Sequence, residues 1–264
     1  MNSLLVVLSI LIGYLIGSIS FARVGLKLAK ANKNISELEI PIEGENESAK
    51  VEIFGANAAS MILGAKAGIT IGIMDMLKAA VPMFLFRFVL YPEDHYYLLV
   101  WVAVLIGHNW PLYFGFKGGR GFSVIFGGLI IIDWLAAIIL PIVGISFGLF
   151  VAGNMIVGYL SWLFFMPIYF WFRTFDLSFL YTALVVFLLF LFSINPEIKT
   201  MTKYRREGKL KEYNEGLYAS SPRWRGMKKM QDYVNNMEKL KSLIGIVVVT
   251  LVIILFLNLN LLPK

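Results

Sequence analysis

The stretch GHNWPLYFGFKGGRGF, from Gly107 to Phe122, joins two long apolar segments and decides how the chain folds around it. Its glycines leave backbone N–H groups accessible, and Lys117 and Arg120 place fixed positive charge beside them. Such a loop suits a phosphate or another oxyanion. The alternative is a tight helix–loop–helix turn whose positive charges lie on the cytoplasmic side. At a membrane surface, the first interpretation predicts an enzyme or carrier that handles a phosphorylated small molecule.

The composition indicates the fold class. Hydrophobic residues make up 58% of the 264 residues and charged residues only 16%, whereas about a quarter is usual in soluble domains. We therefore predict an all-α protein, a polytopic bundle of membrane helices. The net charge of +7 fits cytoplasmic loops that face anionic lipid, and we expect no nucleic-acid partner.

The residue types also limit the chemistry. The chain has no cysteine, which excludes disulfide and thiolate chemistry. Its two histidines, His95 and His108, lack the spacing of a metal site, so we expect no bound metal.

Apolar runs of membrane-spanning length account for most of the chain, since a helix needs roughly 20 apolar residues to cross a bilayer. The candidate segments are 3–28, 67–91, 96–114, 122–132, 134–153, 154–172, 175–194 and 243–262. The first has no basic leader and no convincing cleavage site, so it is interpreted as a retained helix. The fourth holds only 11 residues and would have to be tilted or broken.

The distribution of Lys and Arg predicts the orientation. Residues 195–241 contain twelve Lys and Arg residues and six acidic ones, whereas the connection Tyr91–His95 contains Glu93 and Asp94 and no Lys or Arg. Further basic residues lie near the end of the first segment or after it: Arg23, Lys27, Lys30, Lys33 and Lys50. By the positive-inside rule, the N-terminus lies outside, 195–241 is cytoplasmic, and seven crossings precede residue 195.

The predicted organisation therefore has three parts. Residues 1–194 form a seven-helix membrane domain with a Glu-rich cytoplasmic insert at 31–55. Residues 195–241 form a basic cytoplasmic segment, interpreted as a solvated and partly helical linker, with an interfacial amphipathic element as the alternative. Residues 242–264 form an extra C-terminal transmembrane helix.

Four blocks of sequence carry a resemblance to one family. They are GYLIGSISFARVGLKLA (Gly13–Ala29), GANAASMILGAKAG (Gly55–Gly68) with DMLKAAVP (Asp75–Pro82), the glycine loop, and INPEIKTMTKYRREGK (Ile194–Lys209). Together they resemble the bacterial acyl-phosphate:glycerol-3-phosphate acyltransferases over roughly residues 3–210. The third block is nearly complete against the family's GHxxPxFxxFKGGKG.

The resemblance implies a seven-helix fold in the plasma membrane with an external N-terminus, and an acyltransferase activity. An acyl phosphate would acylate the 1-hydroxyl of glycerol 3-phosphate, giving lysophosphatidic acid for phospholipid synthesis. The resemblance implies no metal, no CoA and no other cofactor. It also implies that membrane lipid surrounds the protein. No oligomeric state follows from it.

The resemblance also implies site residues. The catalytic candidates are His108, Lys117 and Arg120. The candidates for substrate or phosphate binding are Ser18, Ser20, Asn57, Asp75, Lys78, Gly118, Gly119, Gly121 and Asn195. Structural alternatives stand beside these roles: Asp75 and Lys78, three apart in an apolar helix, can pair with each other, and the serines can bond to their own helix backbone.

The second and fourth blocks depart from the family pattern. Val51 stands where the family has Ser, and Met61 stands where it has Arg. Asn195 and Glu197 fall near the family's His and Asn. A second hypothesis follows, in which a divergent and non-acylating homologue binds or transports a phosphorylated lipid or small molecule. If the chain is an acyltransferase, another cation should lie beside Arg120, with Lys50, Lys66, Lys78 and Arg205 as candidates.

Overall fold

The computed structural model of the chain describes residues 2–31, 38–42, 48–50, 54–220, 222–237 and 239–261. Within these ranges, six helical segments are long and apolar enough to cross a membrane: Ser3–Leu28, Ala65–Leu90, Tyr96–Phe114, Trp134–Ala152, Met155–Thr174 and Leu240–Leu257. A seventh candidate is the pair α9 (Leu177–Ser193) and α10 (Asn195–Arg206), bent by 52° where they join. The prediction of a multi-pass helical membrane protein is confirmed.

Short polar side chains mark where several apolar helices begin. The side chain of Asn2 caps α1 (Ser3–Gly17), that of Asp133 caps α7 (Trp134–Ser146), and that of Asn154 caps α8 (Met155–Thr174). Each accepts a hydrogen bond from a backbone N–H in the first turn. Such caps matter in a membrane, because lipid cannot satisfy the free N–H groups at a helix end.

The chain divides into two compact units. The first comprises Met1–Gly128 and Leu189–Arg225, and the second comprises Leu129–Leu188 and Gly226–Lys264. Helices α6 (Phe122–Ile132), α9 and α12 (Pro222–Asn235) run from one unit into the other. The remaining elements of the first unit are α1, α2 (Phe21–Leu28), β1 (Glu39–Pro41), β2 (Ser48–Lys50), α3 (Ala56–Leu63), α4 (Ala65–Phe84), η2 (Leu85–Leu90), α5 (Tyr96–Asn109), η3 (Leu112–Phe114), α10 and α11 (Leu210–Ser220).

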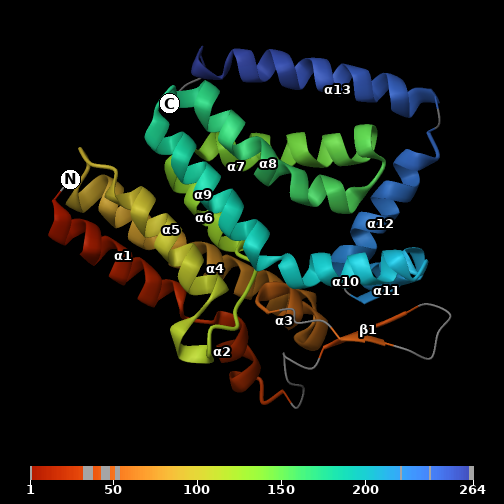
Figure 1. Cartoon of the computed structure of the whole chain (residues 1–264), viewed down its shortest axis with the longest axis horizontal. Helices are drawn as coiled ribbons and strands as arrows, with labels where there is room; N and C mark the ends of the chain where they lie inside the picture. Colours follow the sequence, from red (N-terminus) through yellow and green to blue (C-terminus); the bar gives the residue numbers. More distant parts are fainter. Residues whose placement is uncertain are drawn as a thin grey trace. The chain divides into compact units, whose positions relative to one another are not determined.

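In the first unit, α1 lies along α5 (Figure 1). Glycines allow this close approach: a Cβ built on Gly17 would lie 2.3 Å from the backbone oxygen of Val104. A Cβ on Gly107 would lie 2.2 Å from the backbone oxygen of Tyr14. Small residues are the usual means by which membrane helices pack backbone to backbone. This contact fixes the end of α1 beside the start of the glycine loop.

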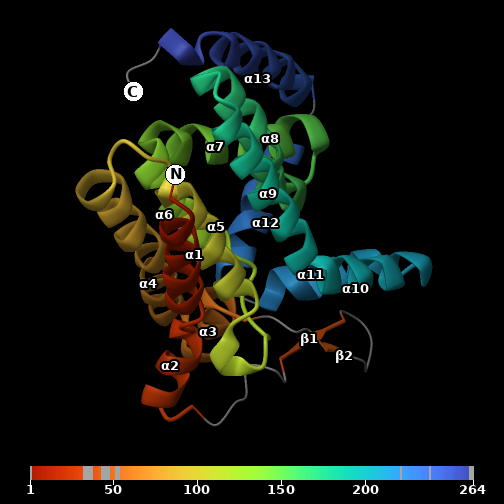
Figure 2. The same cartoon turned by 60° about the vertical axis from the view of Figure 1, so that its left-hand side comes forward.

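The Glu-rich insert contains a two-stranded antiparallel hairpin that packs on α11 (Figure 2). Ile40, at the centre of β1, is fully buried. A Cβ on Gly216 of α11 would lie only 1.9 Å from the backbone oxygen of Pro41. The insert thus contacts the basic segment directly. Val51 and five of the insert's glutamates lie outside the described residues: Glu37, Glu43, Glu45, Glu47 and Glu52.

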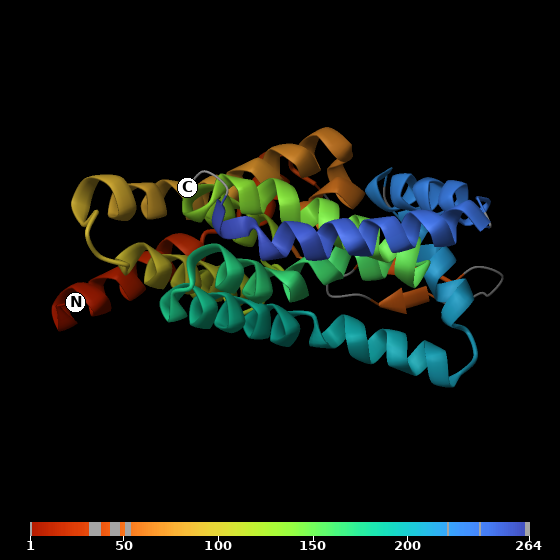
Figure 3. The same cartoon turned by 90° about the horizontal axis from the view of Figure 1, so that it is seen from above.

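The second unit contains α7, η4 (Phe147–Ala152), α8, α13 (Lys239–Leu257) and η5 (Leu259–Leu261), with α13 packed on η4, α8 and α7 (Figure 3). Arg173 of α8 holds η5, because its Nη1 donates to the backbone oxygen of Leu259 at 2.8 Å. Its Nε donates to Asp133 at 2.7 Å, and the same carboxylate accepts from Tyr169 at 2.9 Å. Buried charges in a membrane protein are usually paired in this way.

Candidate functional site

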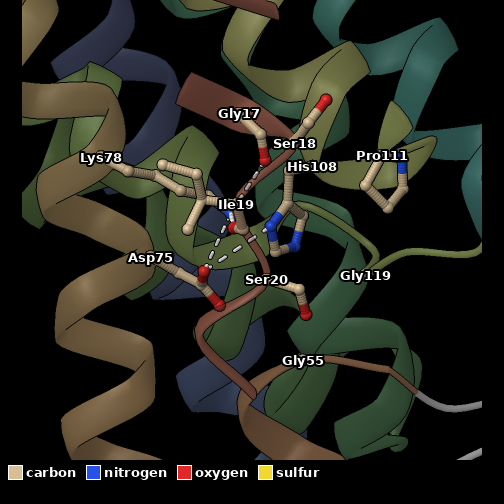
Figure 4. Close-up of a pocket in the computed structure, with 10 residues that line it drawn as sticks. All are labelled: Gly17, Ser18, Ile19, Ser20, Gly55, Asp75, Lys78, His108, Pro111 and Gly119. Atoms are coloured by element: carbon tan, nitrogen blue, oxygen red, sulfur yellow. Dashed lines mark hydrogen bonds and ion pairs between the residues drawn. The ribbon is translucent and has the colours of Figure 1, made fainter. Parts of the chain in front are cut away.

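A small polar pocket lies in the first unit, where the end of α1, the middle of α4, the end of α5 and the glycine loop meet (Figure 4). Ten residues line it: Gly17, Ser18, Ile19, Ser20, Gly55, Asp75, Lys78, His108, Pro111 and Gly119. Six of the residues singled out from the sequence are among them. They come from three separate blocks of the chain, and the fold brings them together.

Asp75 and Lys78 form a buried ion pair on α4. The Nζ of Lys78 lies 3.0 Å from Oδ1 of Asp75, and both side chains are 3% exposed. The same ammonium donates to the backbone oxygen of Gly17 at 3.1 Å and to that of Ile19 at 2.8 Å. These two carbonyls are free to accept because α1 ends at Gly17 and α2 begins only at Phe21. Lys78 therefore fixes the break between α1 and α2 as well as pairing with Asp75.

His108 lies on the opposite wall, with its Nδ1 3.7 Å from Oδ1 of Asp75 (Figure 4). The glycine loop covers the imidazole closely. The N–H of Gly119 donates to the backbone oxygen of His108 at 3.0 Å, and a Cβ on Gly119 would lie 2.1 Å from Nε2. A Cβ on Gly118 would lie 2.1 Å from the backbone oxygen of His108. Both positions thus need glycine so that the loop can lie against His108.

The two serines line the pocket in different ways. The hydroxyl of Ser18 donates to the backbone oxygen of Tyr14 at 2.9 Å and accepts from the N–H of Leu112 at 3.2 Å. It thereby links the end of α1 to the glycine loop. Ser20 caps α2 and accepts from the N–H of Arg23 at 3.4 Å. The structural alternative for Ser18, a bond to its own helix, is present, and the link to Leu112 comes in addition.

Arg120 follows the pocket-lining Gly119 and contacts a carboxylate. Its Nε donates to Oε1 of Glu197 at 2.6 Å, with the two side chains 18% and 29% exposed. Its backbone oxygen accepts from the hydroxyl of Ser193 at 3.3 Å. Burial raises the pKa of the neighbouring Tyr213 to about 12, with further contributions from the negative charge of Glu197 and from Tyr204. The structure therefore places an acidic group against Arg120.

The side chain of Lys50, one of the cations considered for a place beside Arg120, lies outside the described residues.

The other predicted residues are not among those that line the pocket. Lys117 is exposed on the glycine loop, and Asn195 is exposed at the start of α10. Gly121 has a φ of +85°, a conformation that favours glycine. Asn57 lies in the first turn of α3, and its buried Oδ1 has no hydrogen-bond partner within the described part of the chain.

Sequence reasoning missed several lining residues and one neighbour. Gly17, Ile19, Gly55 and Pro111 contribute backbone or ring atoms to the wall, and no side-chain chemistry singled them out. Asn109 was also missed, although its amide oxygen and nitrogen are both buried and neither finds a hydrogen-bond partner in the described ranges. Its position directly after His108 in the loop block was the available signal.

These features define an integral-membrane helical protein with a polar, charged pocket beneath a glycine loop. The family model described as glycerol-3-phosphate acyltransferase matches residues 7–204. The chain belongs to the glycerol-3-phosphate acyltransferase family.

Individual relatives match about half of this chain at moderate sequence identity. A glycerol-3-phosphate acyltransferase of Shouchella clausii is 32% identical over 139 residues, which are 52% of this chain and 62% of that protein. One from Desulfotalea psychrophila is 32% identical over 154 residues, covering 57% of this chain and 68% of that protein. The chain thus spans about three fifths of the length of the first of these relatives.

Two solved structures share the fold. They are crystal structures of PlsY (YgiH), an integral membrane glycerol 3-phosphate acyltransferase, in its glycerol 3-phosphate form and its lysophosphatidic acid form, with TM-scores of 0.62 and 0.59. Each is 20% identical in sequence and matches 76% of this chain and 93% of the other. This likeness confirms the helical membrane fold.

Proposed function

We propose that this protein transfers a fatty acyl group from an acyl phosphate to the 1-hydroxyl of glycerol 3-phosphate. The observation that carries the proposal is the pocket itself. Ser18, Asp75, His108 and Gly119 come from the three blocks that resemble the family before residue 123, and they line one cavity. Membership of the family, and relatives named for this activity, support the same conclusion.

The reaction needs little covalent help from the protein. The hydroxyl oxygen attacks the carbonyl carbon of the acyl phosphate, the bond from that carbon to the phosphate oxygen breaks, and phosphate departs with the electron pair. His108 is the proposed acceptor of the hydroxyl proton, which it passes to the departing phosphate. Because phosphate is a good leaving group, positioning and charge neutralisation supply most of the acceleration.

The glycine loop would supply the charge. Arg120 and the exposed Lys117 are the proposed partners of phosphate oxygens, since guanidinium binds phosphate bidentately and ammonium acts as a point charge. Asp75 and Lys78 would position the substrate indirectly. Lys78 holds the carbonyls of Gly17 and Ile19, which form part of the pocket wall, in place. Asn57 and Asn195 remain proposed polar ligands, as do the backbone N–H groups of Gly118, Gly119 and Gly121.

We also propose the cytoplasmic face of the plasma membrane as the place of reaction. The basic residues of 195–241 and of the glycine loop support this orientation. The acyl chain would lie between helices and open to lipid.

The test is an assay of purified protein in nanodiscs with palmitoyl phosphate and radiolabelled glycerol 3-phosphate. We expect labelled lysophosphatidic acid, no dependence on CoA, and strong loss of turnover in His108→Gln and Arg120→Ala. Lys229→Gln, on the exposed surface of α12, is the control and should keep full turnover. Absence of product with several acyl phosphates, combined with binding of lysophosphatidic acid, would instead favour the non-acylating homologue.

A further inference from the structure

Arg23 lies in the first turn of α2, where the sequence suggested only an orientation charge. In the structure its guanidinium lies between two aromatic rings. The Cζ atom is 5.0 Å from the ring centre of Phe54 and 4.6 Å from that of Phe114. Contacts of this kind attract a cation and fix its position. The guanidinium of this half-buried residue is therefore held in place by the two rings.

One of its donors has no acceptor among the residues that the structure describes. The Nη1 atom of Arg23 is buried and makes no hydrogen bond to the described residues. Arginine cannot release a proton to relieve this, because its guanidinium stays charged in proteins. Leaving a buried, charged donor unsatisfied is costly, and such groups usually have a partner. An anionic ligand would supply the missing acceptor.

Arg23 contacts three segments of the chain that contribute residues to the pocket lining. Its backbone N–H donates to Ser20, which lines the pocket. Phe54 directly precedes Gly55, another lining residue, and Phe114 ends the short helix that follows Pro111, also in the lining. The rings that hold the guanidinium thus belong to segments that form the wall.

The cations nearer the pocket already have negative partners. Lys78 is neutralised by Asp75 and also satisfies two carbonyls. Arg120 pairs with Glu197. A phosphomonoester brings close to two negative charges at neutral pH, so its binding here calls for a further cation with an available donor.

We propose that Arg23 binds the phosphate group of a substrate and substitutes for the arginine that the family pattern has where this chain has Met61. Helix α3, which carries Met61, packs against α2, so the replacement comes from the neighbouring helix. The ligand class is a phosphomonoester or acyl phosphate, bound through the guanidinium fork. The inference rests on the proposed function, which supplies two phosphorylated substrates.

The experiment compares Arg23→Gln and Arg23→Lys with Lys27→Gln, a control on the same helix whose side chain is exposed. Initial rates are measured while glycerol 3-phosphate is varied at fixed acyl phosphate, and then the reverse. Arg23→Gln should raise one of the two KM values by about 10- to 100-fold, the loss expected for a hydrogen bond to a charged group. Its kcat should change less than its KM, and the substrate whose KM rises is the one that Arg23 binds.

Lysine keeps the charge but loses the fork, so Arg23→Lys should give a smaller rise in the same KM, whereas Lys27→Gln should match the wild type. If Arg23→Gln does not fold, Arg23→Lys decides. Unchanged KM values for both substrates in a folded Arg23 variant would overturn the proposal.

A second measurement separates this inference from the proposed function. If the wild type shows no turnover, calorimetry with glycerol 3-phosphate and with inorganic phosphate still tests Arg23. Weaker binding in Arg23→Gln than in Lys27→Gln would support the phosphate site without the acyltransferase activity. Equal binding in the two variants would refute it.

Discussion

The ammonium group of Lys78 has three oxygen partners, namely Asp75 and the carbonyls of Gly17 and Ile19. An ammonium has three donors, so this arrangement can use all of them. The residue therefore stabilises the break between α1 and α2, which forms one wall of the pocket. The sequence made Lys78 a candidate for binding substrate phosphate. In the structure its ammonium group instead holds the backbone carbonyls of Gly17 and Ile19 and pairs with Asp75.

Lys78→Met should consequently destabilise the protein. Removing one partner of a buried ion pair leaves an uncompensated charge on Asp75 and typically costs about 3–5 kcal/mol. The double variant Asp75→Asn/Lys78→Met removes both charges and should recover part of that loss. Thermal unfolding of both variants in detergent measures the difference. A single variant as stable as the wild type would show that the pair contributes nothing.

Gly119→Ala tests the close fit between the loop and His108. The new Cβ would lie 2.1 Å from Nε2 of His108, so the imidazole or the loop has to move. We expect a loss of about 1–3 kcal/mol, the usual cost of overpacking, and a strong loss of turnover. Gly226→Ala is the matched control, because a Cβ on Gly226 of α12 would have no atom of the described residues within 4 Å. Equal behaviour of the two variants would contradict the described fit.

Several residues of the pocket could be predicted from the sequence, but their interaction partners could not. Ser18, Asp75, Lys78 and His108 could be singled out because polar groups within apolar helices are conspicuous. The ion pair of Arg120 joins residues 77 apart in the sequence, and the setting of Arg23 depends on two distant aromatic rings. Such proximities arise from tertiary packing and leave no local pattern.

Helix α10 brings Glu197 to the glycine loop. This helix begins at Asn195, directly after α9, and its first turn contains both Pro196 and Glu197, residue types favoured at a helix start. The carboxylate of Glu197 occupies part of the hydrogen-bonding capacity of Arg120. Any phosphate that binds Arg120 has to compete with it.

Glu197→Gln should therefore strengthen phosphate binding. A partly exposed ion pair is worth up to about 1 kcal/mol, so we expect the affinity for glycerol 3-phosphate to rise by about three- to fivefold. Glu207→Gln is the control, since Glu207 is an exposed carboxylate whose ion pair is with the exposed Lys203, at 3.9 Å. Calorimetry in nanodiscs gives both affinities. Weaker binding in Glu197→Gln would mean that the carboxylate assists the ligand instead of competing with it.

The helices themselves followed closely from the sequence. The apolar segments at 122–132 and 134–153 correspond to α6 and to the continuous span Trp134–Ala152. This agreement is expected because bilayer thickness sets the length of a spanning helix. The hairpin of β1 and β2 was not foreseen, since a short polar strand pair has neither the length nor the periodicity that would reveal it.

The length of the span that precedes the acidic turn bears on the topology of the molecule. Ala65–Leu90 contains 26 residues, which extend about 39 Å at 1.5 Å per residue. That length exceeds the hydrocarbon core of about 30 Å. We therefore expect the acidic turn Tyr91–His95 and the segment before Ala65 to lie on opposite faces, as the proposed orientation requires.

Cysteine labelling tests this orientation in a chain that has no cysteine of its own. Single cysteines replace Glu93 and Lys211, both exposed. In intact cells, a membrane-impermeant maleimide should label position 93, while position 211 should react only after permeabilisation. Labelling of both positions from the same side would disprove the seven-crossing arrangement.

The packing of the hairpin on α11 determines which segments can be exchanged between this protein and its relatives. Pro41 and Gly216 meet so closely that a side chain at position 216 would collide with the strand backbone, and the same helix position lies against the fully buried Ile40. Two stretches far apart in the gene thus form a single transplantable module. A chimera that receives the insert without α11, or α11 without the insert, would expose an apolar surface to water. Recombination can move the two together or leave both behind.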